Sequence, residues 1–84
     1  MSTEIELKIT CFAALRKYFE ATELIKCTLP VRCSEILEKL KAKNPEAEIM
    51  LGKCRIAIGE QFVPQDFVLT ENVVVFLIPP SSGG

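Results

Sequence analysis

The sequence predicts one α+β domain, a mixed β-sheet with helices packed on one face. Strand-like and helix-like periodicities alternate along the chain, in the order strand, short helix, strand, long helix and three further strands. Of the 84 residues, 49% are hydrophobic, which is too many for a disordered chain, and this length can build a single core. The last apolar run, residues 73–78, has the composition of a strand inside a sheet.

The first third of the chain predicts two strands with a short helix between them. Residues 5–11 alternate between apolar and polar side chains, as a half-buried strand does. Residues 12–20 change to a helical period and predict an amphipathic helix of about two turns, with Leu15, Tyr18 and Phe19 on one side. Residues 23–29 alternate again, with Ile25, Cys27 and Leu29 inward, and Pro30 ends this second strand.

The main helix is predicted to open at Cys33-Ser34-Glu35. Ser34 suits the N-cap position, and Cys33 is the alternative. Asn44-Pro45 stops the helix. Its buried stripe is formed by Ile36, Leu37 and Leu40.

Residues 45–53 follow as a loosely structured segment. Within it, Ile49, Met50 and Leu51 are expected to fold back on the core as a lid.

Three further strands are predicted in the second half. Residues 55–58 form the third strand, which turns at Gly59-Glu60 into a short fourth strand at residues 62–63. The loop of residues 64–72 has Leu69 as its buried anchor, and Asn72 suits a left-handed turn before the last strand.

The end of the chain joins an apolar strand to a small, flexible segment. Residues 79–84 read P-P-S-S-G-G, and proline cannot donate to a strand ladder, so the strand ends at residue 78. We therefore divide the chain into a domain of residues 1–78 and a flexible tail of residues 79–84. A core strand that runs directly into a Gly-Gly carboxylate predicts a flexible, reactive C-terminal tail attached to a rigid domain.

Composition and charge indicate which partners to expect. Ten basic and eleven acidic residues give a net charge of −1, which favours neither nucleic acid nor an anionic membrane as a partner. No apolar run approaches the roughly 20 residues of a membrane span. The N-terminus lacks the pattern of a signal peptide, so a cytoplasmic protein is expected.

The four cysteines are interpreted as structural thiols rather than metal ligands. None forms a C-x-x-C pair and the chain has no histidine, so no metal site is expected. Cys11, Cys27 and Cys54 are expected to be buried as small hydrophobic groups. Cys33 is expected to be more exposed, and a thioester or persulfide role for it is left open.

The ending F-L-I-P-P-S-S-G-G, directly after an apolar strand, resembles that of the small subunit of molybdopterin synthase, a ubiquitin-fold sulfur carrier. I-T-C-F-A-A-L-R-K-Y-F and C-S-E-I-L-E-K-L are similar to the first strand and helix and to the main helix of that family. R-I-A-I-G and V-L-T-E-N-V-V-V are similar to its later turns, with Gly59 where the family often has Asn and Val73 where an acidic residue is common. The resemblance covers nearly the whole chain. It implies a ubiquitin-like β-grasp fold, with the first and last strands parallel at the centre of the sheet.

The resemblance also implies a non-catalytic sulfur-carrying subunit, whose reacting residue is Gly84. An E1-like adenylyltransferase would use ATP to adenylate Gly84, and a sulfur donor enzyme would then convert it to a thiocarboxylate. The sulfur would pass to cyclic pyranopterin monophosphate in the large synthase subunit, in molybdenum cofactor biosynthesis. Catalytic groups would come from these partners, and the chain itself is expected to bind no cofactor.

The tail has the physical properties that this chemistry needs. Gly83 and Gly84 carry no side chains, so they can pass through a narrow channel. Six residues can extend about 20 Å, far enough to enter a partner's site. A frayed end or a cloning remnant is the alternative interpretation of the last four residues. The tail residues expected to contact the partner are Pro79, Pro80, Ser81 and Ser82.

A partner surface is expected on the sheet face beside the tail. Both alternating sets of the last strand are apolar, while helices can cover only one face of so small a sheet. The resemblance places Ile78 toward the partner, and parity adds Phe76 and Val74, with Phe62 on a neighbouring strand. The alternative is that residues 45–53 fold over this face and bury it.

Two other functions remain open at this stage. One is a sulfur carrier for thiamine synthesis or for tRNA thiolation, which would use the same tail chemistry. The other is a ubiquitin-like modifier or binding module that acts by docking alone.

Overall fold

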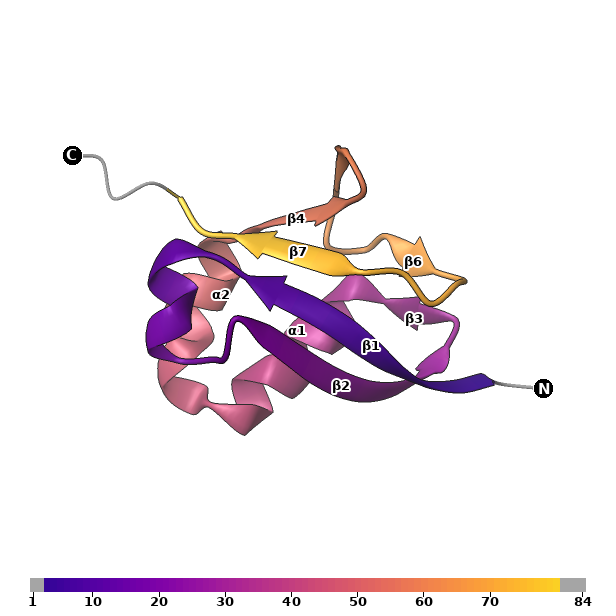
Figure 1. Ribbon diagram of the computed structural model, residues 1–84, viewed down its shortest axis with the longest axis horizontal. Coiled ribbons are helices and arrows are strands. Elements are labelled where there is room, and N and C mark those ends of the chain that lie inside the picture. The colour runs from indigo at the N-terminus through magenta and orange to yellow at the C-terminus, as the bar shows by residue number, and fades with distance from the viewer. Residues whose placement is uncertain (1–2, 81–84) are drawn as a thin grey trace.

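A mixed five-stranded sheet with helices on one face forms the fold of this computed structural model, which describes residues 3–80 (Figure 1). The strand order is β2-β1-β7-β4-β5, and β3 pairs with β6 in a separate two-stranded sheet. The elements in chain order are β1 (Thr3–Cys11), the 3₁₀ helix η1 (Ala13–Lys17), β2 (Thr22–Leu29), β3 (Val31–Arg32), α1 (Cys33–Lys43), the 3₁₀ helix η2 (Pro45–Ala47), α2 (Glu48–Lys53), β4 (Arg55–Ile58), β5 (Gln61–Val63), β6 (Val68–Leu69) and β7 (Val75–Ile78).

The last strand lies in the middle of the large sheet. β7 runs parallel to β1, with Ile9 opposite Val75 and Cys11 opposite Leu77, and antiparallel to β4 on its other side. Because β7 has a hydrogen-bonded neighbour on both sides, an uninterrupted apolar sequence suits it. The predicted adjacency of the first and last strands is confirmed.

The core lies between the sheet and α1, where the inward residues of each strand meet one face of the helix. The inward sets predicted for residues 5–11 and 23–29 are confirmed by alternating burial. The helix contributes the three residues expected of it, Ile36, Leu37 and Leu40. The most deeply buried side chains include Leu7, Ile9, Leu15, Ile36, Leu40, Val75 and Leu77.

The first helix is shorter and tighter than the periodicity of residues 12–20 predicts. Only residues 13–17 are helical, and they form a 3₁₀ helix. The chain must return quickly to the sheet, because the Cys11 N–H already donates to the Ala21 carbonyl at 2.8 Å. The turn begins at Ala13, whose φ of 51° is in the left-handed region. Leu15 and Phe19 are buried as expected.

The N-cap of α1 is Arg32, so the prediction of Ser34 or Cys33 is wrong. The Arg32 N–H donates to the Glu35 carboxylate at 2.8 Å. The Cys33 and Ser34 N–H groups donate to the carbonyls of Phe67 and Gln65. Because this loop satisfies the first amides of the helix, no hydroxyl cap is needed.

Residues 45–53 are helical, which corrects the expectation of a loose segment. Asn44 accepts a hydrogen bond from the Glu46 N–H at 3.2 Å, and this starts η2. Leu51 is buried in the core as expected, while Ile49 is 75% exposed and belongs to no lid. The segment packs beside α1, on the helix side of the sheet (Figure 1).

Two further expectations near β7 are wrong. The strand begins at Val75, two residues later than predicted, and the preceding loop contains β6. Asn72 does not adopt a left-handed conformation. Leu69 is the buried anchor of this loop, and Gly59 makes the turn after β4 with φ of 62°, both as predicted.

Candidate functional site

The sheet face turned away from the helices carries a row of side chains across four strands. Strand pairing places Thr10 beside Phe76, Phe76 opposite Ala57, and Ala57 opposite Phe62. Side chains paired in this way share one face of a sheet. Phe62 is 60% exposed, and Phe76 is half-buried.

The two other residues predicted for a partner surface lie on this same face. Ile78 is half-buried at the end of β7, and Val74 is 40% exposed just before the strand. The predicted parity is therefore confirmed, because Val75 and Leu77 are buried in the core instead. Residues 45–53 lie on the opposite side of the sheet, so they do not cover the face that carries Phe76 and Ile78.

Phe12 joins this surface, and sequence reasoning missed it. Its ring centroid lies 6.0 Å from that of Phe76, with the planes inclined by 33°. Phe12 directly follows β1 and continues its alternation, so its outward direction could have been predicted from parity. We name the set Phe12, Ala57, Phe62, Val74, Phe76 and Ile78 the outer apolar face.

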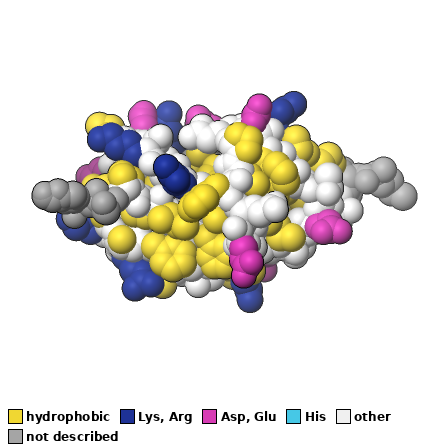
Figure 2. Space-filling model, turned by 90° about the horizontal axis from the view of Figure 1, so that it is seen from above, with side chains coloured by type: hydrophobic (Ala, Val, Ile, Leu, Met, Phe, Trp, Pro, Cys, Tyr) yellow, Lys and Arg dark blue, Asp and Glu magenta, His cyan; other side chains and the backbone are white. Residues whose placement is uncertain are grey.

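A basic residue also lies within the outer apolar face. Arg55 is paired with Ile78 across the ladder between β4 and β7. Its guanidinium carbon lies 5.3 Å from the centroid of the Phe62 ring, in cation–π geometry. Seen from above, hydrophobic side chains gather across the middle of the surface, with both basic and acidic side chains among and beside them (Figure 2).

The root of the tail lies at the edge of the outer apolar face. The Leu77 carbonyl accepts a hydrogen bond from the Phe12 N–H at 3.3 Å, which fastens the end of β7 to the segment after β1. Pro79 is buried, and Pro80 is exposed. The remaining predicted tail residues, Ser81, Ser82, Gly83 and Gly84, lie outside the described residues.

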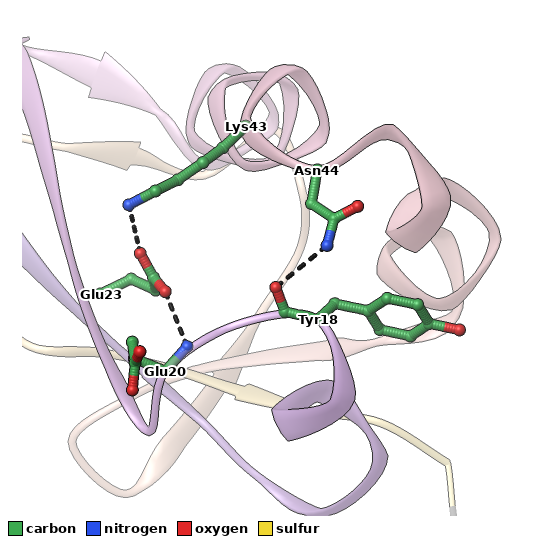
Figure 3. Close-up of polar contacts among 5 residues, drawn as sticks. All are labelled: Tyr18, Glu20, Glu23, Lys43 and Asn44. Atoms are coloured by element: carbon green, nitrogen blue, oxygen red, sulfur yellow. Dashed lines mark hydrogen bonds and ion pairs between the residues drawn. The ribbon is translucent and has the colours of Figure 1, made fainter.

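A polar cluster ties the turn after η1 to the end of α1 (Figure 3). Glu23 is 6% exposed, and its carboxylate accepts hydrogen bonds from Lys43 and, at 2.7 Å, from the Glu20 N–H. Asn44 donates to the Tyr18 carbonyl at 3.1 Å. These contacts hold the segment that returns from the tail root to β2.

The Glu23 carboxylate stays ionised in spite of its burial. Burial alone would raise its pKa, but the hydrogen bonds from Lys43 and Glu20 and the charge of Lys43 outweigh that effect. The pKa of Glu23 is therefore lowered from its ordinary value of 4.5. Glu23 has the same parity as the inward residues Ile25, Cys27 and Leu29, so the alternation of this strand could have indicated its burial.

All four thiols are buried and free. This confirms the expected burial of Cys11, Cys27 and Cys54, whereas the expectation of a more exposed Cys33 is wrong, since it is 1% exposed. Burial raises the pKa of every one of them, to about 11 for Cys11 and Cys54. Thiols with such values are poor nucleophiles at neutral pH.

Neither a metal centre nor a membrane-spanning helix is found in the part of the chain described by the structure. Within residues 3–80, no three His, Cys, Asp or Glu side chains gather as a metal site would require. None of the helices in that range has the length and apolar character to cross a membrane.

Comparison with known proteins places the chain among small β-grasp proteins. The model of the ThiS family matches residues 9–84. A protein of Pyrococcus furiosus, described as molybdopterin converting factor subunit 1, is 21% identical with a TM-score of 0.77, over 90% of this chain and 98% of that one. SAMP1 of Haloferax volcanii is 16% identical with a TM-score of 0.81, over 95% of this chain and 100% of that one. No curated protein matches the chain. These neighbours confirm the ubiquitin-like β-grasp fold.

Proposed function

The chain belongs to the ThiS family, and on that premise we propose that it is a sulfur carrier whose C-terminal residue, Gly84, bears the reacting group. The observation that carries the proposal is the course of β7. This central strand is held on both sides, ends beside the outer apolar face, and leads directly into the P-P-S-S-G-G tail. The strand β7 thus connects the rigid domain, the outer apolar face and the glycine-ended tail.

The chemistry begins at the terminal carboxylate. With a pKa of about 3.5 this group is ionised, and it attacks the α-phosphate of ATP on an E1-like activating enzyme, so that pyrophosphate leaves. A sulfur donor enzyme then supplies a nucleophilic sulfur, which forms the C–S bond as AMP leaves. The donated sulfur is the outer sulfur of a persulfide on the donor, so this step leaves an acyl disulfide. A thiol then attacks the donor's sulfur, the S–S bond breaks, a disulfide forms on the donor side, and a thiocarboxylate remains on Gly84. Gly83, which has no side chain, leaves the acyl carbon accessible.

The molybdopterin pathway is the acceptor pathway that we propose. The P-P-x-x-G-G ending supports it, as does the similarity in fold to a protein described as a molybdopterin converting factor subunit. In this reaction the tail enters the large synthase subunit and gives sulfur to cyclic pyranopterin monophosphate. The domain of residues 1–78 docks, the tail of residues 79–84 reaches the active site, and the reaction takes place in the cytoplasm.

The outer apolar face is the docking surface in this proposal. A contiguous exposed apolar surface is uncommon on a protein that acts alone. Because the tail leaves from its edge, a partner that receives the tail also covers Phe76 and Ile78. The same face therefore serves the activating enzyme and the large subunit in turn.

Removal of Gly84 tests the carrier chemistry. The variant lacking Gly84, and one extended by a single alanine, are combined with purified activating enzyme, sulfur donor and large subunit. We expect both to lose product formation while their thermal unfolding stays that of the full-length chain, since terminal residues contribute little stability. Product formation by the shortened chain would show that the terminal carboxylate is not the carrier.

A further inference from the structure

Arg55 is a charged residue at the edge of the outer apolar face where the tail begins. It opens β4 opposite Ile78, the last residue of β7, so it lies beside the root of the tail. Its guanidinium lies over the Phe62 ring, 5.3 Å from the centroid. The long side chain is therefore directed along the outer apolar face, where a docking partner would cover it.

No carboxylate of residues 3–80 forms an ion pair with Arg55. On the same face, Glu6 lies opposite Lys26 in the register of β1 and β2, and Glu4 lies further along β1, at the end away from the tail. Glu60 lies in the turn at the opposite end of β4. The part of the face next to the tail thus has a positive charge that this part of the molecule does not neutralise.

A partner that covers the outer apolar face must remove water from Arg55. A guanidinium that loses water without gaining a partner opposes association strongly, and it cannot be neutralised by losing its proton. A carboxylate matches it best, because two parallel N–H···O bonds can form while the plane of the guanidinium remains stacked on an aromatic ring. Charge complementarity therefore specifies one chemical group on the partner.

We propose that Arg55 is the residue that determines specificity on this surface, and that each enzyme receiving the tail presents an Asp or Glu side chain which pairs with it. The inference rests on the proposed function and adds a requirement to it. Apolar contacts with Phe76 and Ile78 supply contact area. The Arg55–carboxylate pair fixes the position of the domain on the partner, and with it the position from which the tail enters the active site. An enzyme without the carboxylate is rejected, because docking would leave the guanidinium desolvated and unpaired.

Binding of Arg55 variants to the purified large subunit and to the purified activating enzyme tests the proposal. We expect Arg55→Glu and Arg55→Met to raise Kd by roughly 30-fold or more, as loss of one member of a covered charge pair does, and Arg55→Lys to raise it less. Wild-type binding should weaken as salt increases, and binding of Arg55→Met should depend less on salt. Lys39→Glu, an exposed charge reversal on α1, should bind as the wild type does.

The decisive experiment restores the ion pair between Arg55 and the partner with its two charges exchanged. Each Asp or Glu on the partner surface is replaced in turn by Arg, and one such replacement should recover binding of Arg55→Glu while weakening that of the wild type. If Arg55→Met and Arg55→Glu bind as the wild type does while Phe76→Asp does not, the proposal for Arg55 is wrong and the docking surface stands. If Phe76→Asp also binds normally, the docking surface itself is wrong.

Discussion

Glu23 shows how one residue supports the site from a distance. Its carboxylate joins the turn after η1 to Lys43 at the end of α1, and that turn continues from the segment that fastens β7. A buried charge is tolerated here because two donors satisfy it. The residue therefore contributes to the stability of the tail root without touching it.

Glu23→Gln should make the stability of the protein less dependent on pH. Because the folded pKa of Glu23 lies below its ordinary 4.5, the ionised group stabilises the fold above that value, and the contribution is lost as pH falls through the folded pKa. We expect the substitution to cost about 1–3 kcal/mol at pH 7 and much less at pH 3, measured by urea unfolding. Glu20→Gln is the matched control, since only the backbone of Glu20 contacts Glu23. Equal losses at both pH values would contradict the account.

The thiols should be structural groups and not sulfur carriers. Cys11 and Cys54 have pKa values of about 11, so at pH 8 almost no thiolate is present to react. We expect slow alkylation of all four cysteines in the folded protein and complete alkylation after unfolding, followed by mass spectrometry. Single changes of Cys11, Cys27 or Cys54 to Ala should cost roughly 1–2 kcal/mol and leave sulfur transfer in place. A cysteine whose replacement stops transfer in a folded protein would overturn this.

At the scale of elements, β7 connects the fold to the function. Its inward residues, Val75 and Leu77, are fixed in the core, while Phe76 and Ile78 face outward on the same four-residue strand. Any movement of the strand would therefore disturb the core as well as the surface. This coupling keeps the tail root in a constant position relative to the outer apolar face.

Phe76→Asp tests the surface of this element. The side chain is only half-buried and belongs to no core cluster, so the variant should remain folded. A carboxylate placed in an apolar interface should abolish binding to both the activating enzyme and the large subunit. Val68→Asp, at an exposed position of β6 on a different strand pair, is the control and should bind normally. Normal binding by Phe76→Asp, or its unfolding, would contradict the assignment.

Much of the fold could be predicted from the sequence, because its strands alternate cleanly and its end is distinctive. Two of the errors share a physical cause, because they lie where distant backbone decides the local structure. The N-cap of α1 is set by carbonyls of residues 65 and 67, and the turn at Ala13 by the need to return to β2. Similarly, Phe12 and Arg55 come beside Phe76 and Ile78 only because β7 pairs with β1 and β4, although the alternation of β1 could have indicated the outward direction of Phe12.

As a whole, the molecule is proposed to be a rigid domain that presents its C-terminal tail to other proteins. In the proposed function, the described residues supply the docking surface and the root of the tail, while the reacting carbon is that of Gly84. The alternative functions are a sulfur carrier for another acceptor and a modifier that is joined to lysines of other proteins. All of these would share the fold, so the chemical state of Gly84 distinguishes them better than any structural measurement.

The most direct test is the intact mass of the protein isolated from its native host, followed by fragmentation of its C-terminal peptide. The account predicts a population whose mass is higher by the exchange of one oxygen for one sulfur, with the change confined to Gly84 and lost on incubation with the large subunit and its pterin substrate. A carboxylate alone, even in cells that lack the large subunit, would contradict the central claim. Conjugates joined to lysines through Gly84, without any thiocarboxylate, would contradict it in favour of a modifier.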